Sequence, residues 1–267
     1  MSKVHIYGGG TFNYVRNHLA LSAIAFGSTA KRLRQLLLLE SDLHLTKMAD
    51  SSSDIVTNDD LDLHLKEILK DKDVKCIIMN AALCDYDGQI GNVESGKYAD
   101  RLESREGVQE MILSPANKVI GQIKTIRPDI IVVGFKTTAN EHDDGIMQYK
   151  GQRMDVDAVL INDVVLRKNI LLAYDSFVSF SDRDEALICL AEFVQNHIRD
   201  ESKIKNIRTR GKWKTYSIEV LKSTCRIDAF NQACEILKSE GVEGDYLDGR
   251  WSMFHQGIYN VSINTEE

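Results

Sequence analysis

An apolar run that ends in two small residues and an acid constrains the fold of this chain most. The run at 74–80 leads into Ala81 and Ala82, and then into Asp85 and Tyr86. A strand buried in a parallel sheet forms such a run, and its carboxyl end lies at the open edge where α/β folds bind ligands. The pattern predicts a parallel sheet with functional residues at that edge, although the same residues also suit an ordinary strand end.

Segments with the periodicity of strands and of helices alternate as far as residue 200. Strands are expected at 3–7, 43–48, 74–80, 108–113, 130–135, 158–162, 169–175 and 177–180. Helices are expected at 14–38, 61–69, 117–126 and 184–197. This order predicts an α/β fold, a doubly wound, mostly parallel, Rossmann-like sheet with helices on both faces.

The composition changes beyond residue 199, where the alternation is lost. Strands are expected at 212–221, 246–254 and 257–263, and a helix at 227–239. We therefore predict two domains, a main domain at 1–200 and a small α+β lobe at 201–267. Basic residues gather at 203–214, near Trp213 and Tyr216. Such a run can hold a phosphate or single-stranded nucleic acid, but it is more often a solvated linker.

Composition and charge exclude several classes of protein. A net charge of −7 argues against a nucleic-acid partner for the chain as a whole. The five cysteines include no CxxC pair and the seven histidines no HxxxH or HExxH pair, so no metal-ligating residues are expected. No apolar run approaches the roughly 20 residues that cross a bilayer, and the start of the chain lacks a signal-peptide core. We expect a cytoplasmic protein without a membrane partner.

A glycine-rich turn is expected at 8–11, directly after the first strand. The backbone amides of Gly9 and Gly10 can approach phosphate oxygens in such a turn, because nothing blocks them. Lys136 follows the strand at 130–135 and offers a positive charge to a triphosphate. The plainer alternatives are that the glycines serve a tight turn and that Lys136 is a surface residue.

Two acids follow other strands. Asp85 or Asp163 could hold magnesium or the amide of a base, and Asn162 stands beside Asp163. Because these strand ends are expected at one edge of the sheet, they would line one crevice with the glycine turn. The alternative for Asn162 and Asp163 is that they cap the next turn.

Several short motifs follow one another in a distinctive order. They are Gly9-Gly10-Thr11, Val15-Arg16, Ala81-Ala82-Leu83-Cys84-Asp85-Tyr86, Arg101-Leu102-Glu103-Ser104 with Gly107, Pro115, Val133-Gly134-Phe135-Lys136 and Ile161-Asn162-Asp163. This order resembles the phosphopantothenate-cysteine ligase family, which includes the synthetase half of the bifunctional flavoprotein of coenzyme A biosynthesis. The resemblance implies a homodimer. It also implies a magnesium-dependent ligase that attacks the α-phosphate of CTP or ATP with a carboxylate and passes the acyl group to an amine.

The resemblance also suggests site residues. Those implied for the nucleotide are Gly9, Gly10, Thr11, Ala81, Ala82, Asp85, Phe135, Lys136, Asn162 and Asp163. The catalytic lysine of the family falls on Arg101, and Lys97 is a possible substitute in space. The family's N-x-S-S-G loop has no match here, and Asn17 corresponds to its asparagine only if several residues are deleted.

Three classes of function stay open on this pattern. The first is a CTP- or ATP-dependent acid-amine ligase, acting on phosphopantothenate and cysteine or on a related pair. The second is a catalytically altered nucleotide-binding or regulatory protein with the same fold. The third, a dinucleotide oxidoreductase, is disfavoured because Asn13 stands where the third glycine of the fingerprint is needed.

Overall fold

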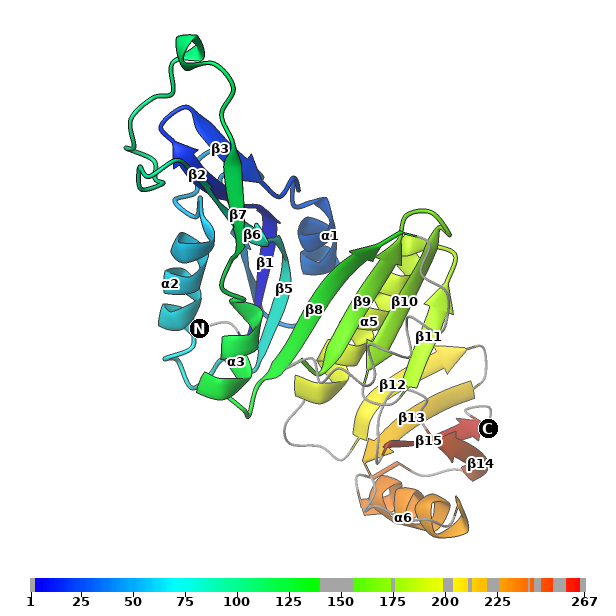
Figure 1. Ribbon diagram of the computed structural model, residues 1–267. Helices are drawn as coiled ribbons and strands as arrows, with labels where there is room; N and C mark the ends of the chain where they lie inside the picture. The colour runs from blue at the N-terminus through cyan, green and yellow to red at the C-terminus, as the bar shows by residue number, and fades with distance from the viewer. Residues whose placement is uncertain are drawn as a thin grey trace. The chain divides into compact units, whose positions relative to one another are not determined.

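The α/β class is confirmed by a mixed, seven-stranded sheet (Figure 1). The computed structural model describes residues 3–139, 156–173, 176–198, 204–210, 213–219, 226–239, 241–242, 246–251 and 258–264. The strand order is β11-β10-β9-β8-β5-β1-β4. The bounds are β1 Val4–Gly10, β4 Ser41–Leu45, β5 Cys76–Ala82, β8 Ile131–Thr138, β9 Ala158–Asp163, β10 Lys168–Ala173 and β11 Ser176–Phe180. Strands β4, β1, β5 and β8 run parallel, whereas β9, β10 and β11 pair antiparallel.

The chain divides into two compact units. The first unit comprises residues 1–136 and 152–157, and the second comprises 137–151 and 158–267. The domain boundary that we expected at residue 200 stays a prediction. Among the helices of the described ranges, none combines the length and apolar character that crossing a membrane requires.

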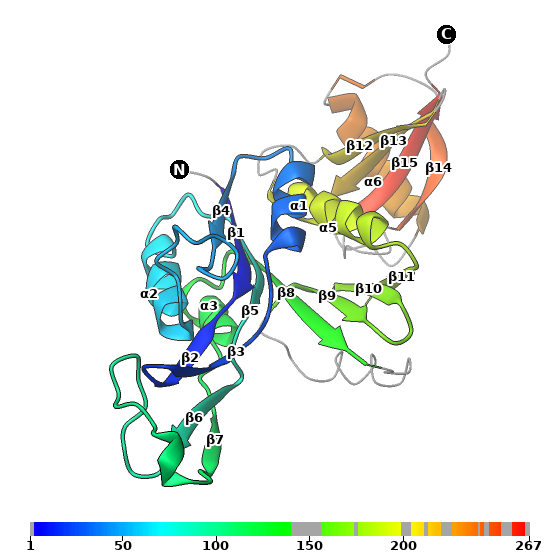
Figure 2. The same cartoon turned by 90° about the horizontal axis from the view of Figure 1, so that it is seen from above.

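Helices lie on both faces of the parallel strands in the first unit. They are α1 Ser28–Leu36, α2 Asn58–Ile68 and α3 Ile120–Ile126 (Figure 2). Gly8 of β1 faces Ala30 of α1, whereas its neighbour Tyr7 packs with Leu61 and Leu65 of α2. Since successive strand residues point to opposite faces, α1 and α2 cover opposite faces of β1.

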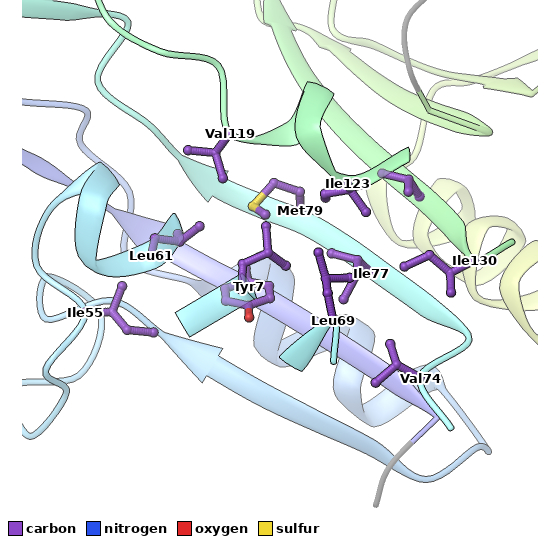
Figure 3. Close-up of a cluster of buried hydrophobic side chains, with 12 residues drawn as sticks. Tyr7, Ile55, Leu61, Leu69, Val74, Ile77, Met79, Val119, Ile123 and Ile130 are labelled. Atoms are coloured by element: carbon purple, nitrogen blue, oxygen red, sulfur yellow. The ribbon is translucent and has the colours of Figure 1, made fainter. Parts of the chain in front are cut away.

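The core under α2 and α3 is a single cluster of apolar side chains (Figure 3). Tyr7 on β1 and Ile77 and Met79 on β5 meet Leu61 from α2 and Ile123 from α3. Burying each such side chain stabilises the fold by about 1.5–3 kcal/mol. This cluster holds the two helices against the carboxyl halves of β1 and β5.

The helix predicted at 14–38 is wrong over its first half, and its second half is confirmed as α1. A hairpin of β2 Phe12–Arg16 and β3 Leu19–Ser22 comes first, and α1 begins only at Ser28. Aromatic and β-branched residues dominate β2, and they favour a strand. Beyond β3, the apolar side chains of Ile24 and Phe26 are exposed, so their helical spacing marks no buried face.

The glycine turn predicted at 8–11 is also wrong, because Gly8, Gly9 and Gly10 belong to β1. Gly10 lies opposite Ala82 of β5 in the parallel ladder. Pairing with β5 continues the strand through these residues. They are glycines because the chain packs too close to them for a side chain. An ideal Cβ on Gly8 would lie 2.3 Å from the Cβ of Ala30.

A second hairpin stands beside the first. Its strands are β6 Tyr86–Ile90 and β7 Met111–Pro115, and a short 3-10 turn spans Ser104–Glu106 between them. We expected a strand at 108–113 and no strand between it and the one at 74–80. The strand in that region pairs with β6 in a separate two-stranded sheet, and every residue of β7 is exposed.

In the second unit, α5 Arg183–Ile198 packs on β10 and β11, and a small antiparallel sheet follows. Its strand order is β12-β13-β15-β14, with β12 Ile204–Arg210, β13 Trp213–Glu219, β14 Tyr246–Trp251, β15 Ile258–Asn264 and helix α6 Arg226–Ser239. Tyr216, Tyr259 and Leu237 form its core with their neighbours. The basic run predicted as a linker contains β12, which pairs with β13.

Candidate functional site

Thr11 joins the carboxyl ends of β1 and β5. Its side chain is completely buried. The backbone amide of Thr11 donates to the carbonyl of Ala82 at 3.0 Å, and its hydroxyl donates to Oδ1 of Asn58 at 2.6 Å. The same hydroxyl accepts from the amide of Cys84 at 3.1 Å. These bonds hold the segment that leads to Asp85 in one conformation.

Asn58 is a member of this site that the sequence analysis missed. It is the first residue of α2, and its Nδ2 donates to the carbonyl of Cys84 at 2.8 Å. A capping box of Thr57 and Asp60 fixes the start of α2 at this point. That sequence signature could have located the helix start, but not the contact with Cys84.

Thr11→Val is expected to lower the free energy of unfolding by about 2 kcal/mol. Valine has nearly the same shape but no hydroxyl, so the buried amide of Cys84 and Oδ1 of Asn58 each lose one hydrogen bond and keep only the 3.2 Å bond between them. Urea unfolding measures the change. A Thr11→Ser variant keeps the hydroxyl and should lose clearly less; equal losses in the two variants would show that only the methyl group matters.

The glycines of β1 are less open than the sequence suggested. The amide of Gly10 donates to the carbonyl of Ala25 at 2.8 Å. An ideal Cβ on Gly10 would lie 1.8 Å from the carbonyl oxygen of Ala23, and Gly9 has a φ of +101°. The expectation that nothing blocks the amide of Gly10 is therefore wrong, because the segment before α1 packs on it. The assignment of Gly9 and Gly10 to a nucleotide site stays a prediction.

Opposite charges lie at the carboxyl ends of two neighbouring strands. Asp85 follows β5 and is exposed, and its carbonyl accepts from the amide of Ala116 at 2.9 Å. Lys136 is exposed near the end of β8, directly after the half-buried Phe135. Because β5 and β8 run parallel in register, with Met79 opposite Gly134, both strands deliver these residues to the same edge. Together with the half-buried Ala81 and Ala82, they form the edge of the first unit that can receive a ligand.

Asn162 and Asp163 lie in the second unit. Asp163 is 2% exposed, and its carboxylate accepts from the Thr138 hydroxyl at 2.9 Å and from the amides of Val165 and Leu166 at 3.0 and 2.7 Å. This arrangement is that of a turn cap, the alternative left open for this residue. The proposed nucleotide contact of Asp163 stays a prediction.

The three catalytic candidates lie on two segments that one backbone hydrogen bond joins. The amide of Asn17, between β2 and β3, donates to the carbonyl of Ala99 at 3.1 Å, and Lys97 and Arg101 flank Ala99 in sequence. Lys97 and Arg101 are both exposed. The length of β2, about 15 Å at the usual rise per residue, separates Asn17 from Thr11. The structure thus brings Asn17 to the loop that carries Lys97 and Arg101, at a distance from Thr11.

Arg16, at the end of β2, is bonded to the start of the loop that follows β6. Its buried guanidinium donates to the carbonyls of Val15 at 2.7 Å and of Ile90, and more weakly to that of Val93 at 3.5 Å. Three carbonyl dipoles thus surround the cation, and they connect β2 to the end of β6. Within the described residues, no group of three or more His, Cys, Asp or Glu side chains is arranged to hold a metal ion.

This fold, with a site at the carboxyl edge of its parallel strands, defines the chain as a doubly wound α/β protein. Residues 23–198 match the family model described as the DNA/pantothenate metabolism flavoprotein C-terminal domain. The chain belongs to this family, which confirms the resemblance drawn from the motifs.

Solved structures with the same fold have low sequence identity to this chain. The DNA/pantothenate metabolism flavoprotein from Streptococcus pneumoniae aligns with a TM-score of 0.61 and 18% identity, covering 73% of this chain and 99% of that chain. The C-terminal domain of the coenzyme A biosynthesis bifunctional protein CoaBC aligns with a TM-score of 0.50 and 11% identity, covering 71% and 91%. No curated protein sequence matches this chain.

Proposed function

We propose that this protein is an acid-amine ligase of coenzyme A biosynthesis that uses CTP or ATP. Membership of the DNA/pantothenate metabolism flavoprotein C-terminal domain family supports the class of reaction. The observation that carries the proposal is the edge of the first unit, where Asp85 and Lys136 end neighbouring parallel strands and Thr11 fixes the segment before Asp85. Sheets of this kind bind ligands at that edge.

The proposed reaction solves one chemical problem, since a carboxylate does not react with an amine until it has a leaving group. A carboxylate oxygen of the acid attacks the α-phosphorus of the nucleotide, and pyrophosphate leaves. The amine nitrogen then attacks the acyl carbon, the nucleoside monophosphate leaves with the bonding electron pair, and the amine loses a proton. The role of the protein is to orient the reactants and stabilise negative charge, which suits the ammonium of Lys136.

A magnesium ion fits this edge because an exposed carboxylate beside bound phosphates is a usual magnesium ligand. Asp85 would hold it, and the ion would offset part of the charge of the triphosphate. Arg101, Lys97 and Asn17 are proposed as the catalytic group, and Phe135 and Asn162 as further nucleotide contacts.

We also propose a cytoplasmic homodimer with domains at 1–200 and 201–267. The hairpin of β6 and β7 supports the dimer, because it exposes Met111, Leu113 and Tyr86 along one face and Ile112 on the other. Adjacent apolar side chains of this kind are typical of protein interfaces.

The second candidate is a nucleotide-binding or regulatory protein that no longer catalyses ligation. The bonded amide of Gly10 favours it, because that donor is no longer available to a phosphate. The missing Ser-Ser-Gly segment of the family loop points in the same direction.

Pyrophosphate release separates the two candidates. The assay combines the full chain with CTP or ATP, magnesium and candidate acids, including phosphopantothenate, with and without cysteine. Release that depends on the acid supports the ligase. Nucleotide binding in calorimetry without pyrophosphate for any acid would contradict the ligase and favour the binding protein.

Lys136→Ala is expected to weaken nucleotide binding by about 1–3 kcal/mol, as for the loss of one charge-assisted hydrogen bond. Calorimetric titration with CTP and ATP measures the change. Lys70→Ala is the matched control, because Lys70 lies just beyond the end of α2 on the same unit, is exposed, and pairs with Glu67 of that helix. Unchanged affinity in Lys136→Ala would remove this lysine from the site.

A further inference from the structure

Among the described residues, Arg183, the first residue of α5 in the second unit, has a single polar partner. Its NH1 donates to Oδ1 of Asn169 on β10 at 2.9 Å. Within the described part of the chain, its guanidinium pairs with no carboxylate. A guanidinium carries five N–H donors, so most of its capacity remains unused.

The surroundings of Arg183 do not favour an unpaired cation. Burial lowers the pKa of Arg183, and no neighbouring charge contributes to that shift. The side chain also stands at the amino end of a 16-residue helix, which carries partial positive charge. Asp182, Asp184 and Glu185 share the same turn, but the Asp182 carboxylate caps the amide of Glu185 instead of pairing with Arg183.

One carboxamide, that of Asn169, is bonded to the guanidinium, and a second, that of Asn162, lies on the neighbouring strand. Asn169 is only 5% exposed, and it lies directly opposite Asn162 in the antiparallel ladder of β9 and β10. Residues directly opposite each other share one face of a sheet, with Cβ atoms about 5 Å apart. Oδ1 of Asn169 is bound to Arg183, and its amide nitrogen donates to no other group of the described residues. The side chains of Arg183, Asn169 and Asn162 therefore offer several N–H donors, and none of the three is itself negatively charged.

We infer that Arg183, Asn169 and Asn162 form a subsite for an oxyanion, a phosphate or a carboxylate group, in the second unit. An anion would offset the half-buried charge and the helix end together, and it would accept the unused N–H donors. Planar guanidinium groups bind both kinds of oxyanion with two parallel hydrogen bonds. Asn162 is also proposed above as a nucleotide contact, but Arg183 and Asn169, which carry the inference, belong to the second unit and to none of the proposed nucleotide contacts.

Calorimetric titration of the full chain with inorganic phosphate, pyrophosphate and succinate tests the subsite and distinguishes the two kinds of oxyanion. We expect at least one of the three to bind, and Arg183→Gln to weaken that binding at least about ten-fold. Arg183→Lys should give an intermediate affinity, because it keeps the charge and loses the planar fork. Asn162→Ala should weaken binding without touching the Arg183–Asn169 bond.

Lys168→Met is the matched control. Lys168 is an exposed cation next to Asn169 in sequence, and its side chain points to the opposite face of the sheet. The Lys168→Met variant should bind the anion with the affinity of the wild type. Thermal unfolding should show that all variants are folded. No binding of any of the three anions, or equal affinity in the wild type and Arg183→Gln, would overturn the inference. Loss of nucleotide binding in Lys136→Ala with phosphate binding intact would separate the two sites.

Discussion

Gly10→Ala is expected to lower the free energy of unfolding by at least about 3 kcal/mol. The added Cβ would lie 1.8 Å from the carbonyl oxygen of Ala23 and 2.8 Å from the amide nitrogen of Ala25. Both are backbone atoms, so a rotamer change cannot relieve the clash. Overpacking of this kind typically costs about 1–3 kcal/mol. Because the backbone of Ala23 and Ala25 cannot move as freely as a side chain, we expect a cost at or above the upper limit of that range. The hydrogen bond from Gly10 to Ala25 would lengthen as the two segments separate.

Urea unfolding followed by circular dichroism measures this change. Gly96→Ala is the matched control, because nothing lies within 4 Å of the Cβ position there and the φ angle is not in the left-handed region. It should change stability by less than about 1 kcal/mol, since the main effect is on the unfolded chain. If Gly10→Ala behaved like Gly96→Ala, the segment before α1 would not pack on β1 as described.

Acidification is expected to destabilise the first unit through three clustered histidines. Nδ1 of His5 on β1 and Nε2 of His44 on β4 are 2.9 Å apart, and the rings of His44 and His64 have centroids 4.6 Å apart. Nδ1 of His64, on α2, lies 2.9 Å from the hydroxyl of Tyr7. An imidazole–imidazole hydrogen bond needs one unprotonated nitrogen, so protonating both His5 and His44 would break it.

The direction of the effect follows from the pKa of His44. Burial, and then the charges of His64 and His5, lower that pKa to about 4, with Asp42 acting in the opposite direction. Burial and His5 also lower the pKa of His64. A lowered pKa means that the unfolded chain binds more protons, so the stabilisation is complete above about pH 6.5 and is lost as the pH falls toward 4. For His44 the loss is about 3 kcal/mol.

The measurement is the free energy of unfolding between pH 7.5 and 4 for the wild type and for His44→Gln. Glutamine does not titrate, so the variant should show a shallower pH dependence by about 3 kcal/mol over this range. Comparing the two curves removes the contribution of carboxylates that titrate in both. His18→Gln changes an exposed histidine outside the cluster and should retain the wild-type curve. Parallel curves for the wild type and His44→Gln would contradict the prediction.

The predictions from sequence held where local pattern decides the structure. The apolar runs at 74–80 and 130–135 became β5 and β8, because each is short, rich in β-branched residues and buried on both faces. The helix at 61–69 is present as α2, which begins slightly earlier at its capping box. The position of Asp85 just beyond β5 followed from the strand itself.

The predictions failed where contacts between segments, and not local periodicity, decide the structure. Residues 14–38 have apolar spacing that suits a helix, but β2 and β3 pair with each other and leave Ile24 and Phe26 exposed. The glycines at 8–10 read as a turn, and only the packing of Ala23 and Ala30 against them shows why β1 continues through them. Periodicity reports which residues share a face, but not what lies against that face.

The sequence by itself determined the α/β class, the strands that supply the edge, and the family, because local periodicity and motif order are properties of the chain. Only the tertiary structure decided which groups hydrogen-bond to one another. It joined Asn58 to Thr11, gave the amide of Gly10 to Ala25, and left Arg183 with one neutral acceptor. Hydrogen bonds between residues far apart in sequence, and the burial of their side chains, depend on how the helices and strands pack. No local sequence pattern encodes that packing.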